Sequence, residues 1–177
     1  MITIGFVGLG TIGGVIAKNI QRAGYSMCIH DVRLAAVKPL VDGGAQYATS
    51  PAEVTRECAV VFTSLPGPPQ VEQVALGPNG LVHGLHDGSI YVDLSSSSAD
   101  LIRRIDAEFA SHGARVMDAP LIVGKDGIAK RSVQVLASGA QATFDDVKHL
   151  FDAFSDTVVY TGELRSEERR VGKECRL

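Results

Sequence analysis

The chain has 177 residues, of which 45% are hydrophobic and 21% charged, and its net charge is −3. This length fits one domain of ~100–200 residues with a buried core. The acidic balance argues against a nucleic-acid partner, no apolar run approaches the ~20 residues of a membrane span, and three scattered cysteines fit neither a disulfide framework nor a metal site. Because the start of the chain has no basic leader, we expect a cytoplasmic protein.

Short apolar runs alternate with amphipathic segments along the whole chain. The runs are continuously apolar, which is typical of parallel strands covered on both faces. We predict strands over residues 2–7, 27–30, 59–64, 89–94, 115–117 and 133–137.

The segments between these runs carry helix signals. Apolar residues from Ile12 to Ala23 fall on one helical face, and Gly24 should end that helix. The sequence Ser50-Pro51-Ala52-Glu53 is a capping box with Pro at the first helical position. Two further apolar stripes predict helices over residues 101–109 and 144–151. The alternation predicts a Rossmann-type α/β fold, with a doubly wound, mostly parallel sheet and helices on both faces.

A glycine motif joins the first predicted strand to the first predicted helix. Gly8 allows a tight turn, Gly10 lets a pyrophosphate approach the backbone, and Gly13 lets the helix pack against the strand. The N-terminus of the helix attracts the phosphate charge. The motif reads Gly8-Leu9-Gly10-Thr11-Ile12-Gly13.

Asp31 follows the second predicted strand, where an acid can hydrogen-bond an adenosine ribose. Together with the glycine motif it predicts a dinucleotide site. A structural turn with a solvated acid is the less favoured interpretation, because strand, glycines, helix and acid all fall in order. Asp31 favours NAD by repelling a 2′-phosphate, whereas Arg33 can pair with that phosphate and keeps NADP as the alternative.

In these motifs the chain resembles the β-hydroxyacid dehydrogenases, which include 3-hydroxyisobutyrate dehydrogenase and tartronate semialdehyde reductase and are related to 6-phosphogluconate dehydrogenase. The resemblance covers residues 2–162, which correspond to the N-terminal cofactor domain of that family. Besides the glycine motif, it is carried by Ser50-Pro51-Ala52-Glu53-Val54, Leu65-Pro66, Asp93-Leu94-Ser95-Ser96 and Asp118-Ala119-Pro120.

The resemblance assigns roles to individual positions. It implies that the glycine motif cradles the pyrophosphate, that Asp31 binds the adenosine ribose, and that Leu65 and Pro66 line the nicotinamide side. It also implies that Ser95 contacts substrate and that Ser96 contacts cofactor and substrate. The alternative, that residues 95–98 only cap the helix that follows, stays open.

Two departures from the family pattern concern the chemistry. In the family a serine and backbone amides bind the substrate carboxylate, and here Ile122 and Val123, followed by Gly124, occupy those substrate positions. Isoleucine donates no hydrogen bond, so the identity of the hydroxyacid stays open. The resemblance places the catalytic lysine at Val171, and Lys173 is out of register, so we assign no catalytic residue.

We therefore expect an NAD(P)-binding domain over residues 1–162 and a charged tail, non-native or disordered, over residues 163–177. We also expect the helical C-terminal domain of the family to be missing. The intact enzyme would oxidise a β-hydroxyacid or reduce its semialdehyde, as a homo-oligomer, and this chain would be a truncated, inactive form. The alternatives are a stand-alone dinucleotide-binding module without catalysis and another Rossmann enzyme, such as a methyltransferase.

Overall fold

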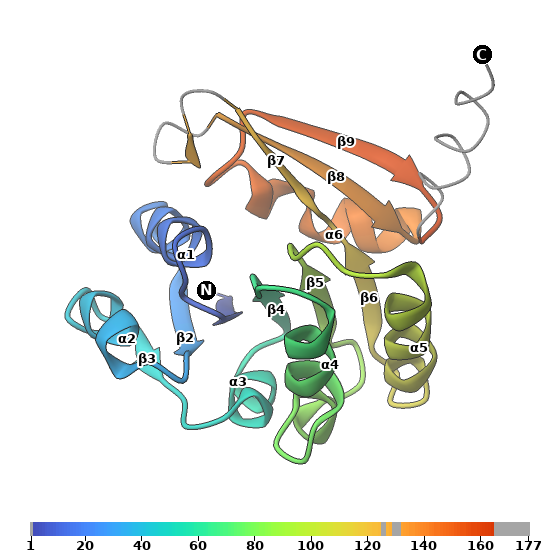
Figure 1. Cartoon of the computed structure of the whole chain (residues 1–177), viewed down its shortest axis with the longest axis horizontal. Helices are drawn as coiled ribbons and strands as arrows, with labels where there is room; N and C mark the ends of the chain where they lie inside the picture. Colours follow the sequence, from blue (N-terminus) through green and yellow to red (C-terminus); the bar gives the residue numbers. More distant parts are fainter. Residues whose placement is uncertain (1, 125–126, 129–131, 165–177) are drawn as a thin grey trace.

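The computed structural model describes residues 2–124, 127–128 and 132–164, which form one sheet flanked by helices (Figure 1). The strands are β1 (Thr3–Val7), β2 (Ser26–His30), β3 (Gln46–Tyr47), β4 (Val60–Thr63), β5 (Ile90–Asp93), β6 (Arg115–Asp118), β7 (Leu121–Val123), β8 (Val133–Gly139) and β9 (Thr157–Gly162). The helices are α1 (Gly13–Arg22), α2 (Leu34–Val41), α3 (Pro51–Glu57), α4 (Pro68–Leu76), α5 (Ala99–Ala110) and α6 (Gln141–Phe151), with one 3-10 turn, η1 (Leu81–Gly84).

The strand order is β3-β2-β1-β4-β5-β6-β8-β7, and β9 also pairs with β8. Strands β1 to β6 are mutually parallel, whereas β8 runs antiparallel to β6 and β7 and parallel to β9. This arrangement confirms the predicted Rossmann-type fold with a mostly parallel sheet. No helix in the described part of the chain is long and apolar enough to cross a membrane.

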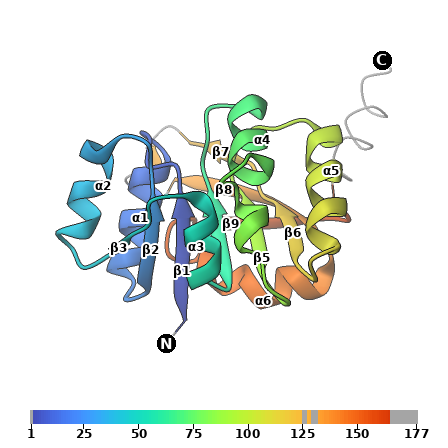
Figure 2. The same ribbon diagram turned by 90° about the horizontal axis from the view of Figure 1, so that it is seen from below.

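The sheet is apolar on both faces, because each face is covered by helices. In β4, Phe62 belongs to the cluster beneath α1, α2 and α6, while Val61 belongs to the cluster beneath α3, α4 and α5. Figure 2 shows α4 and α5 on one side of the sheet and α6 on the other. Burial on both faces explains why the strands read as continuous apolar runs.

All six predicted strands and all four predicted helices form, with ends shifted by a few residues. Five further elements, α2, α4, β3, β7 and β9, were not predicted from the sequence. Helix α2 contains Pro39 and α4 begins with two prolines after Gly67, so both were obscured by residues typical of loops. Strand β3 has only two residues, and β7 follows Pro120 directly, in a stretch that we expected to be a loop.

The predicted helix ends are confirmed, with one correction. Gly24 follows the last turn of α1 at φ +95°, and the Ser50 Oγ accepts a hydrogen bond from the Glu53 N–H at 3.3 Å. The Glu53 carboxylate, however, accepts from the N–H and hydroxyl of Thr49, both at 2.7 Å. The reciprocal bond expected of a capping box therefore goes one residue further upstream.

The predicted boundary near residue 162 falls at the end of β9. Leu164, which we placed in the tail, is partly buried against the cluster beneath α3, α4 and α5. Residues 165–177 lie outside the described residues, so the rest of the predicted tail stays a prediction.

Replacing Phe62 with Ala should lower the free energy of unfolding by about 3–5 kcal/mol, because its ring fills a space that its neighbours cannot refill. Phe62 is fully buried, and its ring centroid lies 6.2 Å from that of Phe6 and 6.1 Å from that of Phe151 on α6. Urea denaturation measures the loss. The control Val41→Ala, at an exposed position of α2, should change stability by no more than about 0.5 kcal/mol. Equal losses in both variants would contradict the role of Phe62.

Candidate functional site

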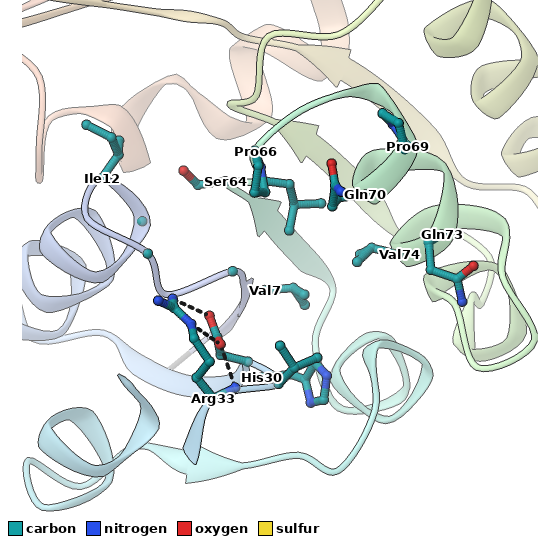
Figure 3. Close-up of a pocket in the computed structure, with 16 residues that line it drawn as sticks. Val7, Ile12, His30, Arg33, Ser64, Pro66, Pro69, Gln70, Gln73 and Val74 are labelled. Carbon is teal, nitrogen blue, oxygen red and sulfur yellow. Dashed lines mark hydrogen bonds and ion pairs between the residues drawn. The ribbon is translucent and has the colours of Figure 1, made fainter. Parts of the chain in front are cut away.

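A cavity of about 670 Å³ lies at the carboxyl ends of β1, β2 and β4 (Figure 3). The strand order reverses between β1 and β4, and in open α/β sheets ligands bind in the crevice at such a switch point. Three segments form the walls: the β1–α1 turn, the end of β2, and the β4–α4 connection with α4. The lining residues are Val7, Gly8, Gly10, Ile12, Gly13, His30, Asp31, Val32, Arg33, Ser64, Leu65, Pro66, Pro69, Gln70, Gln73 and Val74.

The three glycines of the motif play different structural parts. Gly8 has φ +93°, and a Cβ there would overlap the carbonyl oxygen of Ser64. A Cβ on Gly13 would overlap the carbonyl oxygen of Gly8, so Gly13 brings α1 against the turn. A Cβ on Gly10 would meet nothing closer than Arg33 Nη2 at 3.8 Å. Gly8 and Gly13 are therefore required by the fold, whereas Gly10 keeps the cavity open.

The N-terminus of α1 faces this opening without a counter-charge of its own. Ile12, at the N-cap position, makes no side-chain capping bond, and the first turn of α1 holds no acidic residue. The amide dipoles of the helix thus leave partial positive charge beside Gly10. An anion such as a pyrophosphate fits this position.

Asp31 joins the end of β2 to the glycine turn. Its side chain is 6% exposed, and its Oδ2 accepts a hydrogen bond from the Leu9 N–H at 2.6 Å. Burial alone raises the pKa of the Asp31 carboxyl, but hydrogen bonds from Arg33 and Leu9 outweigh burial and hold the pKa below its ordinary value. Asp31 is therefore ionised at neutral pH. Leu9 contributes this amide but does not itself line the cavity.

His30 forms part of the cavity wall beside Asp31. Its ring is stacked on Tyr47 at a centroid distance of 6.4 Å, and its Nδ1 lies 2.9 Å from the carbonyl oxygen of Ala48. These contacts hold the ring against β3. The sequence placed His30 in the strand over residues 27–30 and gave no sign of its place in the cavity.

The turn after β4 is fixed by a buried polar network. Asp93 Oδ1 accepts hydrogen bonds from the Thr63 hydroxyl at 2.8 Å and from the Ser95 N–H at 3.0 Å. The Ser95 Oγ then accepts from the Leu65 N–H at 2.9 Å. This bond positions the Leu65–Pro66 turn. The Ser95 side chain is itself buried, at 3% exposure.

The serines of residues 95–98 make different contacts. Ser98 caps α5, because its Oγ accepts a hydrogen bond from the Leu101 N–H at 3.3 Å, so the predicted helix cap is confirmed at Ser98. Ser96 is exposed and lies outside the cavity lining. Thr11 is likewise exposed and is absent from the lining.

The proposed substrate positions on β7 stand apart from the cavity. Ile122 and Val123 form strand β7 and are 52% and 43% exposed, and the exposed Gly124 bonds through its N–H to the Ser132 carbonyl oxygen at 2.8 Å. None of the three lines the cavity. Val171 and Lys173 lie outside the described residues.

Helix α4 supplies a wall that the sequence analysis missed. Gln70, Gln73 and Val74 recur at the spacing of one helical face and line the cavity with Pro69. In Figure 3 the two glutamines lie across the cavity from Arg33. The prolines at the start of α4 were the available signal, because proline is favoured in the first turn of a helix.

Comparison with known proteins identifies the family. A sequence profile of the NAD-binding domain of 6-phosphogluconate dehydrogenase matches residues 3–162. The chain belongs to this family of NAD-binding domains. Family membership and the geometry of the cavity agree that the chain is an NAD(P)-binding domain of the type found in 3-hydroxyisobutyrate dehydrogenase-like oxidoreductases. The family match counts against the alternative that the chain is a methyltransferase.

Individual relatives extend the comparison. The mitochondrial 3-hydroxyisobutyrate dehydrogenase of Mus musculus is 30% identical over 159 residues, which are 90% of this chain and 48% of the relative. The cytokine-like nuclear factor N-PAC of Homo sapiens is 28% identical over 161 residues, which are 91% of this chain and 29% of that protein. The chain spans about half or less of the length of these curated relatives.

Solved structures show the same fold in this family. A crystal structure of 3-hydroxyisobutyrate dehydrogenase from Salmonella typhimurium is 26% identical with a TM-score of 0.85, over 98% of this chain and 61% of that one. The structure of Psf3 in complex with NADP+ and 2-OPP is 26% identical with a TM-score of 0.87, over 96% of this chain and 61% of that one.

Replacing Gly10 with Ala should weaken NADH binding by roughly tenfold or more without lowering the melting temperature, because the added methyl group enters the open cavity. Gly13→Ala should instead destabilise the fold, since its Cβ overlaps the Gly8 carbonyl oxygen. Thermal unfolding and NADH titration of both variants test this pair. Unchanged NADH binding by Gly10→Ala would contradict the assignment of Gly10.

Proposed function

We propose that the cavity binds NAD(H) along its length. The observation that carries this proposal is that Asp31, Gly10 and the Leu65–Pro66 turn all line one cavity. Asp31 is the partner of the adenosine ribose, and Gly10 with the N-terminus of α1 holds the pyrophosphate. Ile12, Leu65 and Pro66 provide the apolar wall for the nicotinamide. Thr11 and Ser96, which are exposed and outside the lining, are proposed as further cofactor contacts.

The preference for NAD(H) over NADP(H) rests on Asp31. Its carboxylate is ionised and nearly buried, so a 2′-phosphate placed against it meets a negative charge. Ribose hydroxyls, in contrast, can donate hydrogen bonds to the same oxygens. Arg33, beside Asp31, is the residue that can still accommodate NADP(H).

Asp31→Ala should weaken NADH binding by ~1–3 kcal/mol, because it removes the acceptor for the ribose hydroxyls. The unaltered chain should bind NADH more tightly than NADPH, and the variant should lose most of this difference. Fluorescence or calorimetric titration measures both affinities. The matched control Asp42→Ala removes an exposed acid that pairs with Lys38 on α2 and should leave both unchanged. Tighter NADPH binding by the unaltered chain would refute the role of Asp31.

We further propose that the protein to which this domain belongs oxidises a β-hydroxyacid or reduces its semialdehyde. The names of the mouse and Salmonella relatives support this reaction class. Bound NAD supplies the hydride acceptor for such a reaction. Ser96, Ile122 and Val123 are exposed beyond the cavity and are proposed to face the hydroxyacid, the last two with apolar surface.

No side chain that lines the proposed nicotinamide end of the described cavity can serve as the general base. The side chains that line this end are Ile12, Ser64, Leu65 and Pro66, and none of them titrates near neutral pH. Oxidation of a hydroxyl requires a base for its proton, and general acid–base catalysis contributes ~10²–10⁴ in rate. These four side chains therefore offer contacts to the cofactor and no general base.

The 177-residue chain alone should bind NADH and show no NAD-dependent oxidation of 3-hydroxyisobutyrate, glycerate or threonate above background. Absorbance at saturating cofactor measures turnover. A fusion that joins the C-terminal half of a related dehydrogenase after Gly162 should restore some activity with a β-hydroxyacid. Robust turnover by the unfused chain would overturn this expectation and call for another base.

A second candidate function is a dinucleotide-binding module without catalysis. The similarity to N-PAC, whose name describes a nuclear factor, favours this alternative. A catalytically silent fusion, with NADH binding intact, would support the module.

Location and assembly are proposals as well. We propose a reducing compartment, the cytoplasm, because Cys28 and Cys58 are buried free thiols; the mouse relative is named as mitochondrial. Assembly as a homo-oligomer is proposed on the family resemblance.

A further inference from the structure

Arg33 occupies the carboxylate that an adenosine ribose would use. Asp31 Oδ1 accepts hydrogen bonds from the Arg33 N–H at 2.8 Å and from Nε at 3.2 Å. Asp31 Oδ2 accepts from the Leu9 N–H at 2.6 Å and from Arg33 Nη2 at 3.3 Å. Because a carboxylate offers about four lone-pair sites, these four donors fill Asp31. A ribose hydroxyl can bond to it only when one of them leaves.

The guanidinium is the donor that can leave. The Leu9 and Arg33 amides belong to the backbone, and their bonds to Asp31 are the two shorter ones. The guanidinium bonds are longer, and the Arg33 side chain is 60% exposed, so it can turn into solvent without disturbing the core. An ion pair whose arginine is this accessible to water gains little over the solvated guanidinium.

The guanidinium also lies on the path of the ligand. Its Nη2 is the atom nearest to the space that a Cβ on Gly10 would fill, at 3.8 Å. It therefore sits between Asp31 and the glycine turn, where the ribose must connect to the pyrophosphate. In Figure 3 Arg33 reaches back toward the glycine turn, with dashed lines to the carboxylate.

We propose that Arg33 is a gate that the two dinucleotides open in opposite ways. The ribose hydroxyls of NADH displace the guanidinium from Asp31, so the lost ion pair subtracts from NADH affinity. The 2′-phosphate of NADPH draws the same guanidinium to itself, because its greater negative charge is the stronger partner, and this contact offsets the repulsion from Asp31. The gate rests on the proposed dinucleotide function.

The changes in NADH and NADPH affinity on removal of the guanidinium distinguish a gate from other roles of Arg33. If the guanidinium only stacked on the adenine or attracted the pyrophosphate, its removal would weaken NADH and NADPH alike. If Arg33 served the fold alone, neither affinity would change in a stable variant. A gate requires the two affinities to move in opposite directions.

The test replaces Arg33 with Met. Methionine keeps an unbranched side chain like the aliphatic stem of arginine and lacks the guanidinium donors. NADH and NADPH are titrated by fluorescence and calorimetry, with thermal unfolding as a check of the fold. Arg33→Met should bind NADH roughly two- to fivefold more tightly and NADPH roughly tenfold or more weakly. The matched control is Arg103→Met, which removes an exposed arginine paired with Asp100 on α5, outside the cavity lining. It should leave both affinities unchanged.

Two outcomes overturn the gate while the proposed function stands. One is a folded Arg33→Met chain that binds both dinucleotides more weakly, and the other is a folded variant whose affinities both equal those of the unaltered chain. An unaltered chain that binds neither NADH nor NADPH would overturn the proposed function itself, which is a distinct result.

Discussion

The hydrogen bond from the Leu9 N–H to the Asp31 carboxylate holds the site together. Leu9 lies inside the glycine turn after β1, and Asp31 follows β2, so this 2.6 Å contact ties the two loops together, beside the backbone bond from the Gly8 N–H to the His30 carbonyl oxygen. The in-register pairing of Val7 with His30 brings the strand ends level and makes the contact possible. The opening beside Gly10 and the position of Arg33 both depend on this arrangement.

A second tie of the same kind fixes the other end of the cavity. Thr63 and Asp93 are register partners at the ends of β4 and β5, and Asp93 holds the Ser95 amide. Ser95 in turn holds Leu65. In each case a carboxylate at the end of a parallel strand binds the neighbouring loop, so loop geometry follows directly from strand register.

The sequence predicted the features that have local causes. The glycine turn, Asp31 and the Ser50 cap each follow from the backbone geometry or hydrogen bonding of a few adjacent residues. Features that depend on tertiary contacts were missed. Gln70 and Gln73 matter only because α4 forms one wall of the cavity, and the bonds from the Arg33 guanidinium to Asp31 depend on the rotamer that Arg33 adopts. Ser95 was expected to contact ligand, and its buried bond to Leu65 became visible only when two distant turns met.

Asp93 and Arg33 differ in how much a substitution at each position would disturb the rest of the domain. Asp93 is fully buried and bonded to β4 and to the loop that follows β5, so a change there disturbs both the packing and the turn proposed to line the nicotinamide. Arg33 is largely exposed and touches the cavity from outside the core, so a change there leaves the scaffold intact. If the proposed roles hold, cofactor choice can therefore be redesigned at Arg33 while the turn held by Asp93 keeps its shape.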